Sequence, residues 1–232
     1  HNWPGLPAGE FAMRPGPMMA SLDCFDIRIE GVGAHGALPH QGVDPIVAAY
    51  QVVSSLQTLV KRNADPLQAA VVSVTRLHGG DAYNIIPDHI LLGGAIRCFD
   101  DELRAELRAG VRRVATGVAT ALGSKAEVTF VSGNPAVMNS PRETDMAAQV
   151  ARGIVGDHSV HAEHEPIMGS EDFAFMLQQR PGCYIFVGNG DGAGGCMVHN
   201  PRYVFNDEII PLGATYWVRL AEQFLASRAT GG

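Results

Sequence analysis

The order of apolar and polar positions predicts a compact domain in the first half of the chain. Residues 25–30 (FDIRIE) alternate between apolar and charged side chains, the period of two expected of a strand with one solvated face. Asp44 and Pro45 supply the cap and the first residue of a helix that ends near residues 61–63. We expect the apolar stripe of this helix to consist of Ile46, Tyr50, Val53, Leu56 and Val60.

Two more strands, a second helix and a last strand complete this domain. Residues 69–77 and 89–99 are β-branched or apolar runs, and the Gly, Asp and Pro residues between them favour a turn. A helix then begins at Asp101 and stops at Gly123, and residues 127–131 alternate again. The solvated face of the helix that begins at Asp101 is predicted to carry an i, i+4 stripe of arginines, Arg104, Arg108 and Arg112. The order βαββαβ is that of the ferredoxin-like unit, an antiparallel sheet with both helices on one face.

The pattern changes after the linker NPAVMNSP. We expect alternating helices and strands over residues 144–155 (helix), 160–165 (strand), 171–178 (helix), 183–187 (strand) and 207–226 (helix). Alternation of this kind is typical of an α/β layer with parallel strands. The predicted fold class is therefore α/β, with one layer formed by residues 1–20 and 133–232 and interrupted by the ferredoxin-like domain at 21–132.

Composition and charge narrow the range of partners. With 46% hydrophobic and 18% charged residues, the chain can bury a core. Its net charge of −7, without a dense cluster of Lys and Arg, argues against nucleic acid as a partner. The apolar stretches are interrupted well before the ~20 residues that a bilayer requires, so we expect no membrane partner. Four cysteines without disulfide or metal spacing are compatible with a reducing cytosol, and we expect a cytoplasmic protein.

Two histidines at opposite ends of the chain resemble two ligands of one metal site. His1 opens the segment HNWPGLPAG, and His199 lies in MVHNPRYVFND. A catalytic zinc site takes three protein ligands and a two-metal site takes more, usually with a carboxylate as general base. The chain has no CxxC, HExxH or adjacent Glu-Glu pair. The sequence therefore predicts the C-terminal part of a metalloenzyme whose remaining ligands lie upstream.

Five other polar residues have both a structural and a functional interpretation. His35 and His40 lie in a glycine-rich turn, where histidine is often only a surface residue, and Asn84 is a natural turn former. Glu171 lies at a predicted helix start, where acidic residues are expected for structural reasons. Arg97 is a lone cation in an apolar strand, and such a cation needs an anionic partner.

Six segments in order resemble one known family. They are HNWPGLPAG, GAHGALPHQGVDP, YNIIPD, GGAIRCFD, GSEDFAFM and MVHNPRYVFND. Together they resemble the aminoacylase and carboxypeptidase family of metal-dependent amidohydrolases, in the branch of hippurate hydrolase and the N-acyl or auxin-conjugate amino-acid amidohydrolases. The resemblance implies a zinc-peptidase-like α/β domain, present here in part, interrupted by a ferredoxin-like lid through which the protein forms a homodimer.

The resemblance also implies roles for individual residues. His1 and His199 correspond to ligands of a divalent metal, Zn or else Mn, Co or Ni, with two ions in the complete enzyme. His35 corresponds to a lid histidine that enters the partner subunit's active site and hydrogen-bonds the oxyanion of the tetrahedral intermediate. Asn84 and Arg97 correspond to residues that bind the substrate carboxylate. His40, as second choice for the role of His35, and Glu171 complete the expected substrate-binding set.

The expected reaction is hydrolysis of the amide bond of N-acyl amino acids by a metal-activated water, with a Glu outside this chain as general base. On this reading the chain is inactive alone. A different class of function stays open, a non-catalytic dimerisation and ligand-binding module. A third alternative is a dipeptidase or a biosynthetic deacetylase of the same family.

Overall fold

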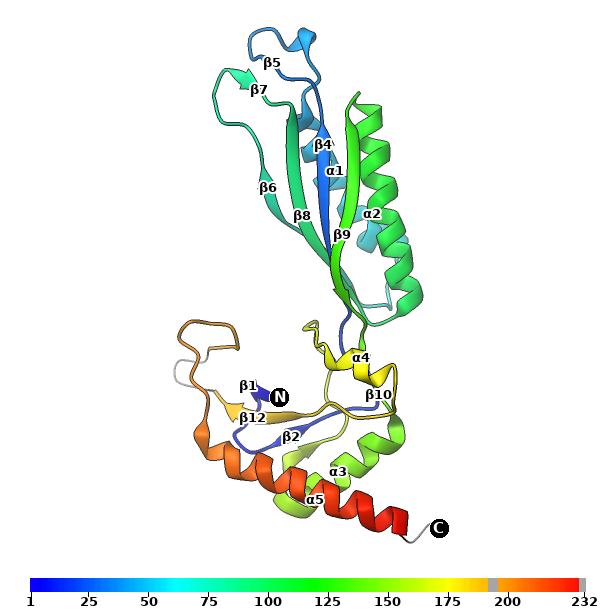
Figure 1. The fold of residues 1–232 in the computed structure, drawn as a ribbon, viewed down its shortest axis with the longest axis vertical. Helices are drawn as coiled ribbons and strands as arrows, with labels where there is room; N and C mark the ends of the chain where they lie inside the picture. Colours follow the sequence, from blue (N-terminus) through cyan, green and yellow to red (C-terminus); the bar gives the residue numbers. More distant parts are fainter. Residues whose placement is uncertain (192–195, 230–232) are drawn as a thin grey trace. The chain divides into compact units, whose positions relative to one another are not determined.

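A computed structural model describes residues 1–191 and 196–229 and divides the chain into two compact units (Figure 1). Unit 1 consists of His1–Met19, Val137–Ile167 and Asp172–Gly232, and unit 2 of Ala20–Ala136 and Met168–Glu171. The α/β fold class predicted from the sequence is confirmed, because both units combine sheets with helices. Among the described residues, no helix is long and apolar enough to cross a membrane.

Unit 2 has the predicted ferredoxin-like order. Its sheet runs β6 (Ala70–His78), β8 (His89–Cys98), β4 (Leu22–Glu30), β9 (Lys125–Asn134), and all neighbours pair antiparallel. Helix α1 (Pro45–Thr58) continues into one π-helical stretch, η2 (Leu59–Asn63), and α2 (Asp101–Ala121) ends before Gly123, whose φ is +78°. A second, two-stranded sheet pairs β5 (Ala34–His35) with β7 (Ile85–Ile86), and η1 (Pro39–Gln41) follows β5.

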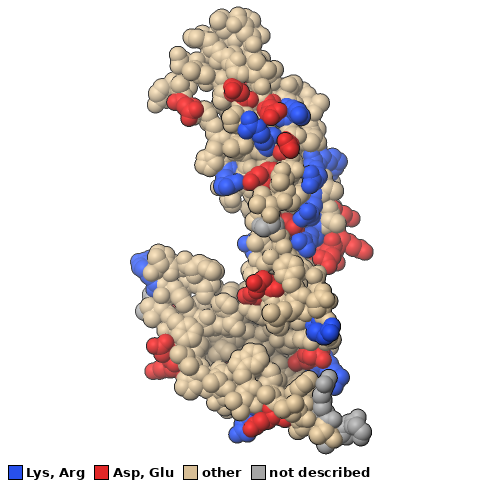
Figure 2. Space-filling model, viewed as in Figure 1, with Lys and Arg blue, Asp and Glu red and all other residues tan. Residues whose placement is uncertain are grey.

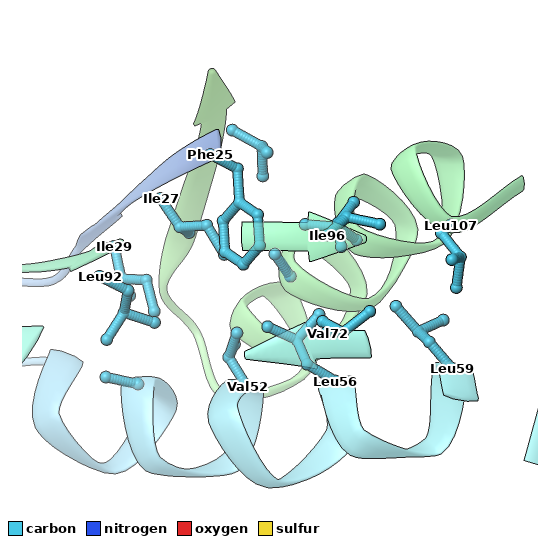
Figure 3. Close-up of a cluster of buried hydrophobic side chains, with 14 of the residues drawn as sticks. Phe25, Ile27, Ile29, Val52, Leu56, Leu59, Val72, Leu92, Ile96 and Leu107 are labelled. Carbon is cyan, nitrogen blue, oxygen red and sulfur yellow. The ribbon is translucent and has the colours of Figure 1, made fainter. Parts of the chain in front are cut away.

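The core of unit 2 lies between the sheet and its two helices (Figure 3). Phe25, Ile27 and Ile29 of β4 are at most 1% exposed, as their alternation predicts. The stripe predicted for α1 is wrong at its first turns, because Ile46 and Tyr50 are 45% and 67% exposed. Helix α1 instead packs through Ala48, Ala49, Val52 and Leu56. Small alanines let the helix approach the sheet closely, which leaves the larger residues on its outer face.

The arginine stripe of α2 is solvated only in part, because Arg112 is exposed but Arg104 and Arg108 are half-buried and bind a buried carboxylate. Arg104 binds the fully buried Asp23 carboxylate twice, with Nε 2.5 Å from Oδ2 and Nη2 3.0 Å from Oδ1, and Arg108 also donates to Oδ1. Arg112 donates to the Val128 carbonyl oxygen at 2.8 Å. The guanidinium of Arg108 lies 4.1 Å from the centre of the Phe130 ring. These arginines fasten α2 to strands β4 and β9.

Unit 1 contains a mixed sheet in the order β1 (Asn2–Pro4), β12 (Phe186–Gly190), β2 (Phe11–Ala12), β11 (Val160–His161). Strands β1 and β12 pair parallel, as do β2 and β11, but β12 and β2 pair antiparallel. The expectation of a parallel layer therefore holds only in part. Strands β1 and β2 lie on either side of β12, and the six residues between them turn the chain back, so that β2 runs opposite to β1.

The other predicted elements of unit 1 agree in type but differ in their bounds, and two strands were not predicted, one of them in the segment NPAVMNSP that was expected to be a linker. Helices α3 (Pro141–Val155) and α5 (Ile210–Ala229) pack against each other, and α4 (Phe173–Leu177) is a short helix. Strands β3 (Gly16–Met19) and β10 (Val137–Asn139) form an antiparallel pair. Two 3-10 turns, η3 (Asp157–Ser159) and η4 (Asp207–Ile209), precede β11 and α5.

Strand β12 begins three residues later than predicted, for a reason visible in the hydrogen bonds. The side chain of Asn139 accepts from the Tyr184 amide at 2.7 Å and donates to the Tyr184 carbonyl oxygen at 2.9 Å. The backbone of Tyr184 therefore pairs with a side chain rather than with a neighbouring strand. Such a contact between distant residues cannot be inferred from local alternation.

Candidate functional site

The structure brings together the two segments that carry the predicted metal-ligand histidines, both in unit 1. The backbone of His1 pairs with the start of β12, since its nitrogen lies 3.1 Å from the Ile185 carbonyl oxygen and its carbonyl oxygen accepts from Val187 at 2.8 Å. The next residue, Asn2, donates to the phenol oxygen of Tyr203, four residues after His199. The segments at the two ends of the chain are therefore neighbours.

The His1 imidazole has one nitrogen committed and one available. Its Nδ1 lies 2.5 Å from the carbonyl oxygen of Asn2. A carbonyl oxygen only accepts, so Nδ1 must carry the proton, and in the neutral ring Nε2 then keeps a free lone pair. A metal-ligating histidine commonly has this arrangement, because the second-shell hydrogen bond fixes the tautomer and the ring orientation. The side chain of His1 is exposed.

His199 adopts an unusual backbone conformation. Among the described residues it is the only one other than glycine with a positive φ, +68°. Histidine is among the residues that tolerate this left-handed region, and such conformations are concentrated at functional sites. The turn is held by Asn200, whose side-chain oxygen accepts from the Arg202 amide at 2.9 Å and whose carbonyl oxygen accepts from Tyr203 at 2.9 Å.

Sequence reasoning did not identify the residue that anchors this loop. Asn189, in β12, is 2% exposed, donates to the Val204 carbonyl oxygen at 3.2 Å and accepts from the Asn206 amide at 2.9 Å. A lone amide in the otherwise apolar and glycine-containing run FVGNG is the sequence signal that could have indicated it, because a buried amide must find hydrogen-bond partners.

The donor set for a metal is incomplete within the part of the chain that the structure describes. No group of three or more His, Cys, Asp or Glu side chains there is placed to hold a metal ion. Two imidazoles on neighbouring segments, one with Nε2 free, fit the role of two ligands, and a complete catalytic site needs at least one more.

Unit 2 brings two other predicted site residues together. His35 in β5 is the antiparallel partner of Ile85 in β7, and the amide of Gly36 donates to the Asn84 carbonyl oxygen at 2.7 Å. Glycine fits the close approach of the two strands here, since a Cβ on Gly36 would lie 3.2 Å from the carbonyl carbon and oxygen of Asn84, a tight contact. Nδ1 of His35 accepts from the Ala37 amide at 3.1 Å, so in the neutral ring Nε2 carries the proton.

Arg97 and Glu171 lie in another part of unit 2. The guanidinium of Arg97, the second-last residue of β8, donates from Nη1 to the Met168 carbonyl oxygen at 2.6 Å. Met168 precedes Glu171 by three residues, so Arg97 holds the GSE segment beside it. Glu171 lies before α4 rather than in it, and its side chain is partly buried. His40 lies in η1 and is exposed.

His35 and Arg97 are far apart within unit 2. Strands β5 and β7 lie beyond the end of the sheet at which β8 begins, whereas Arg97 is near the other end of β8 (Figure 1). From His89 to Arg97 are eight residues, which at ~3.3 Å per residue span about 26 Å. This distance is longer than the His35 side chain, the Arg97 side chain and a small amide substrate placed end to end. One copy of unit 2 cannot place both side chains on the same small substrate.

Two of the four cysteines, Cys98 and Cys183, are poor candidates for a nucleophile. Burial raises the pKa of the Cys98 thiol, which lies beside the Ser21 hydroxyl, and burial raises the pKa of Cys183 to about 11. A thiol attacks as the thiolate, so both groups are held in their unreactive form.

Comparison with known proteins gives the following matches. The model of Peptidase family M20/M25/M40 matches residues 1–223. N-acetylcysteine deacetylase from Bacillus subtilis (strain 168) is 38% identical over 221 residues, which cover 95% of this chain and 57% of that protein. Hippurate hydrolase from Campylobacter jejuni is 34% identical over 227 residues, which cover 97% and 58%. A crystal structure of a Bacillus subtilis protein, described as a dinuclear metal binding peptidase from the M20 family, superposes with a TM-score of 0.74 at 34% identity, over 95% of this chain and 55% of that one. The chain spans little more than half the length of these relatives.

Proposed function

Because the chain belongs to Peptidase family M20/M25/M40, we propose that it carries part of the active site of an enzyme that hydrolyses the amide bond of N-acyl amino acids with the help of divalent metal. Two relatives, named for deacetylation of N-acetylcysteine and for hydrolysis of hippurate, support this substrate class. Both reactions release a carboxylic acid and a free amino acid.

One observation carries the proposal. The hydrogen bond from Asn2 to Tyr203 joins the segment of His1 to the segment of His199, and these are the two histidines expected to bind metal. An exposed His1 with Nε2 available and a His199 held in a left-handed backbone conformation suit this role. Additional ligands and the general base come from outside the described residues.

The metal set is proposed to consist of two divalent ions, with Zn as first choice and Mn, Co or Ni as alternatives. Imidazole nitrogen suits all four. When bound, such ions lower the pKa of water and polarise the carbonyl oxygen of the substrate. The relative described as a dinuclear metal binding peptidase supports the number of ions.

The residues of unit 2 are proposed to bind and polarise the substrate. Arg97 would hold the carboxylate of the amino acid, for which a planar guanidinium is well shaped. Asn84, which lies beside His35, is a further candidate for this carboxylate and would reach it from the subunit that supplies His35. His40 is the second choice for the role of His35. Glu171 lies on the segment that Arg97 fixes, and we assign it to the wall of the same pocket. His35, with its Nε2 proton, would donate to the oxygen that becomes anionic as the tetrahedral intermediate forms.

The distance between His35 and Arg97 leads to a composite site. Since one copy cannot place both residues on one substrate, His35 is proposed to act in the active site of a partner subunit, in a homodimer formed through unit 2. Two exposed surfaces of unit 2 suit a dimer interface: the outer face of α1, with Ile46, Val47 and Tyr50, and the second half of the edge strand β6, with Leu77 exposed. An edge strand has unpaired backbone groups that a second copy can satisfy.

Two other functions remain testable alternatives. A dipeptidase or deacetylase of the same family would use the same groups on a different acyl portion, and the deacetylase among the relatives favours that variant. A non-catalytic dimerisation module would need neither His1 nor His199. We further propose a cytoplasmic location, which the free thiols of Cys24, Cys98 and Cys183 support.

The test uses the complete gene product, stripped of metal and titrated with Zn, Mn or Co. Hydrolysis of N-benzoylglycine, N-acetylcysteine and a dipeptide is measured at each metal concentration. The proposal predicts metal-dependent cleavage of the N-acyl amino acids. His199→Ala should weaken metal binding at least tenfold, whereas His158→Ala, an exposed histidine of η3 in the same unit, should leave it unchanged. Hydrolysis without metal, or equal effects of the two substitutions, would refute the assignment.

A further inference from the structure

Exposed apolar side chains surround His35 on the two segments that meet at β5 and β7. Val32, Leu38 and Ile85 are 53%, 41% and 59% exposed, and Tyr83 is fully exposed. Residues 31–43 contain no Asp, Glu, Lys or Arg, and Figure 2 shows that this end of unit 2 is largely without charged side chains on the face in view. Several exposed apolar side chains on adjacent segments commonly mark a binding surface.

The strand register places one of these side chains next to the imidazole. His35 and Ile85 are directly paired in the antiparallel β5–β7 ladder. Side chains of directly opposed residues lie on the same face, with Cβ atoms about 5 Å apart. Ala34 and Ile86 form the next pair, and their side chains therefore lie on the opposite face.

We propose that Ile85 is a specificity-determining residue that contacts the acyl group of the substrate bound in the partner subunit. The inference rests on the proposed function, in which His35 donates to the carbonyl oxygen of the scissile amide. The acyl group is attached to that same carbonyl carbon, so it lies within reach of a side chain whose Cβ is about 5 Å from that of His35. An isoleucine at this position favours apolar acyl groups over acetyl.

Ile85 is not needed for the core of unit 2. It is 59% exposed and lies outside the buried cluster, whereas Ile90, at the start of β8, is 1% exposed and inside it. Truncation of Ile85 should therefore change what the side chain contacts in trans without unfolding the unit. Leu67, 94% exposed in the turn before β6, is a matched apolar control away from β5 and β7.

The experiment measures kcat/KM of the complete, metal-loaded gene product for N-acetylglycine, N-hexanoylglycine and N-benzoylglycine. The wild-type protein, Ile85→Ala and Leu67→Ala are compared. Contacts of one or a few methylene groups in an apolar pocket are worth about tenfold or more in kcat/KM. Ile85→Ala should therefore lower the hexanoyl-to-acetyl and benzoyl-to-acetyl ratios about tenfold, with the acetyl value nearly unchanged. Leu67→Ala should leave both ratios at the wild-type value.

The outcomes separate this inference from the function on which it rests. If Ile85→Ala lowers all three values by the same factor, or changes none of them, Ile85 does not contact the acyl group and the inference is overturned. If the wild-type protein cleaves none of the three substrates, the proposed function fails first and the inference fails with it. That failure appears in the wild-type protein, whereas failure of the inference alone appears only in the variant.

Discussion

The buried Asp23 carboxylate should contribute strongly to the stability of unit 2. Its side chain is 0% exposed and binds Arg104 twice and Arg108 once, whereas the two arginine side chains are 20% and 37% exposed. Asp23→Asn keeps the size of the side chain and removes its charge. Breaking one partner of a buried ion pair costs 3–5 kcal/mol, and because both arginines can partly rehydrate, we expect a loss near the lower end, about 3 kcal/mol.

Asp26 provides a matched control on the same strand. It pairs with Arg76, but the two side chains are 48% and 59% exposed. Exposed ion pairs contribute about 0–1 kcal/mol, so Asp26→Asn should cost less than about 1 kcal/mol. The two identical substitutions, three residues apart, differ mainly in the burial of the carboxylate.

The assay follows each unit separately during urea denaturation. Both tryptophans of the chain, Trp3 and Trp217, belong to unit 1, so their fluorescence reports on unit 1 and serves as an internal control. Hydrogen exchange of the β4 amides, read by mass spectrometry, gives the free energy of opening of unit 2. Equal losses for Asp23→Asn and Asp26→Asn would refute the view that buried ion pairs hold α2 to the sheet.

Three further predictions concern single side chains. Gly36→Ala brings a Cβ within 3.2 Å of the Asn84 carbonyl group, so β5 and β7 should move apart by a few tenths of an ångström. Hydrogen exchange at residue 36 should speed up, and kcat/KM should fall by less than the roughly 100-fold that a misplacement of about 1 Å costs. Burial raises the pKa of Cys183 to about 11, so its alkylation by iodoacetamide near pH 8 should be about 100-fold slower in the native than in the unfolded protein; equal rates would contradict this. Burial first, and the charge of His161 second, lower the pKa of His164 below its ordinary value of 6.5. The unfolded chain then binds the proton more tightly, so unit 1 should lose stability as pH falls below about 6.5, and His164→Gln should reduce that loss.

Much of the fold of unit 2 was predictable because its patterns are local. Alternation in β4, the Asp44 cap of α1 and the stop at Gly123 each express a preference of a few neighbouring residues, and the structure has all three. The inner face of α1 was not predictable, because two apolar faces compete on that helix. Packing against the sheet determines that the face with Ala48 and Ala49 is the buried one.

Contacts between distant residues account for the other differences. The spacing of the arginines in α2 predicts a solvated stripe, because their partner Asp23 lies about 80 positions earlier in the sequence and only the folded structure brings it to them. In the same way, the side chain of Asn139 binds the backbone of Tyr184, so β12 begins later than predicted. Strand β2 runs antiparallel to β12, which the local sequence did not indicate. Membership of the family was recognisable from six ordered segments and is confirmed, since the family model matches residues 1–223. The roles of His1, His35, Asn84, Arg97 and His199 stay predictions.

The central claim is that each active site takes His35 from one subunit and Arg97 from the other. It is tested most directly by mixing two inactive variants of the complete gene product, His35→Ala and Arg97→Ala, under conditions that exchange subunits. In a mixed dimer one site would have both residues intact and the other neither, so random mixing should restore roughly a quarter of the wild-type activity. If both variants are inactive and the exchanged mixture remains inactive, the two residues act within one subunit and the composite site is refuted.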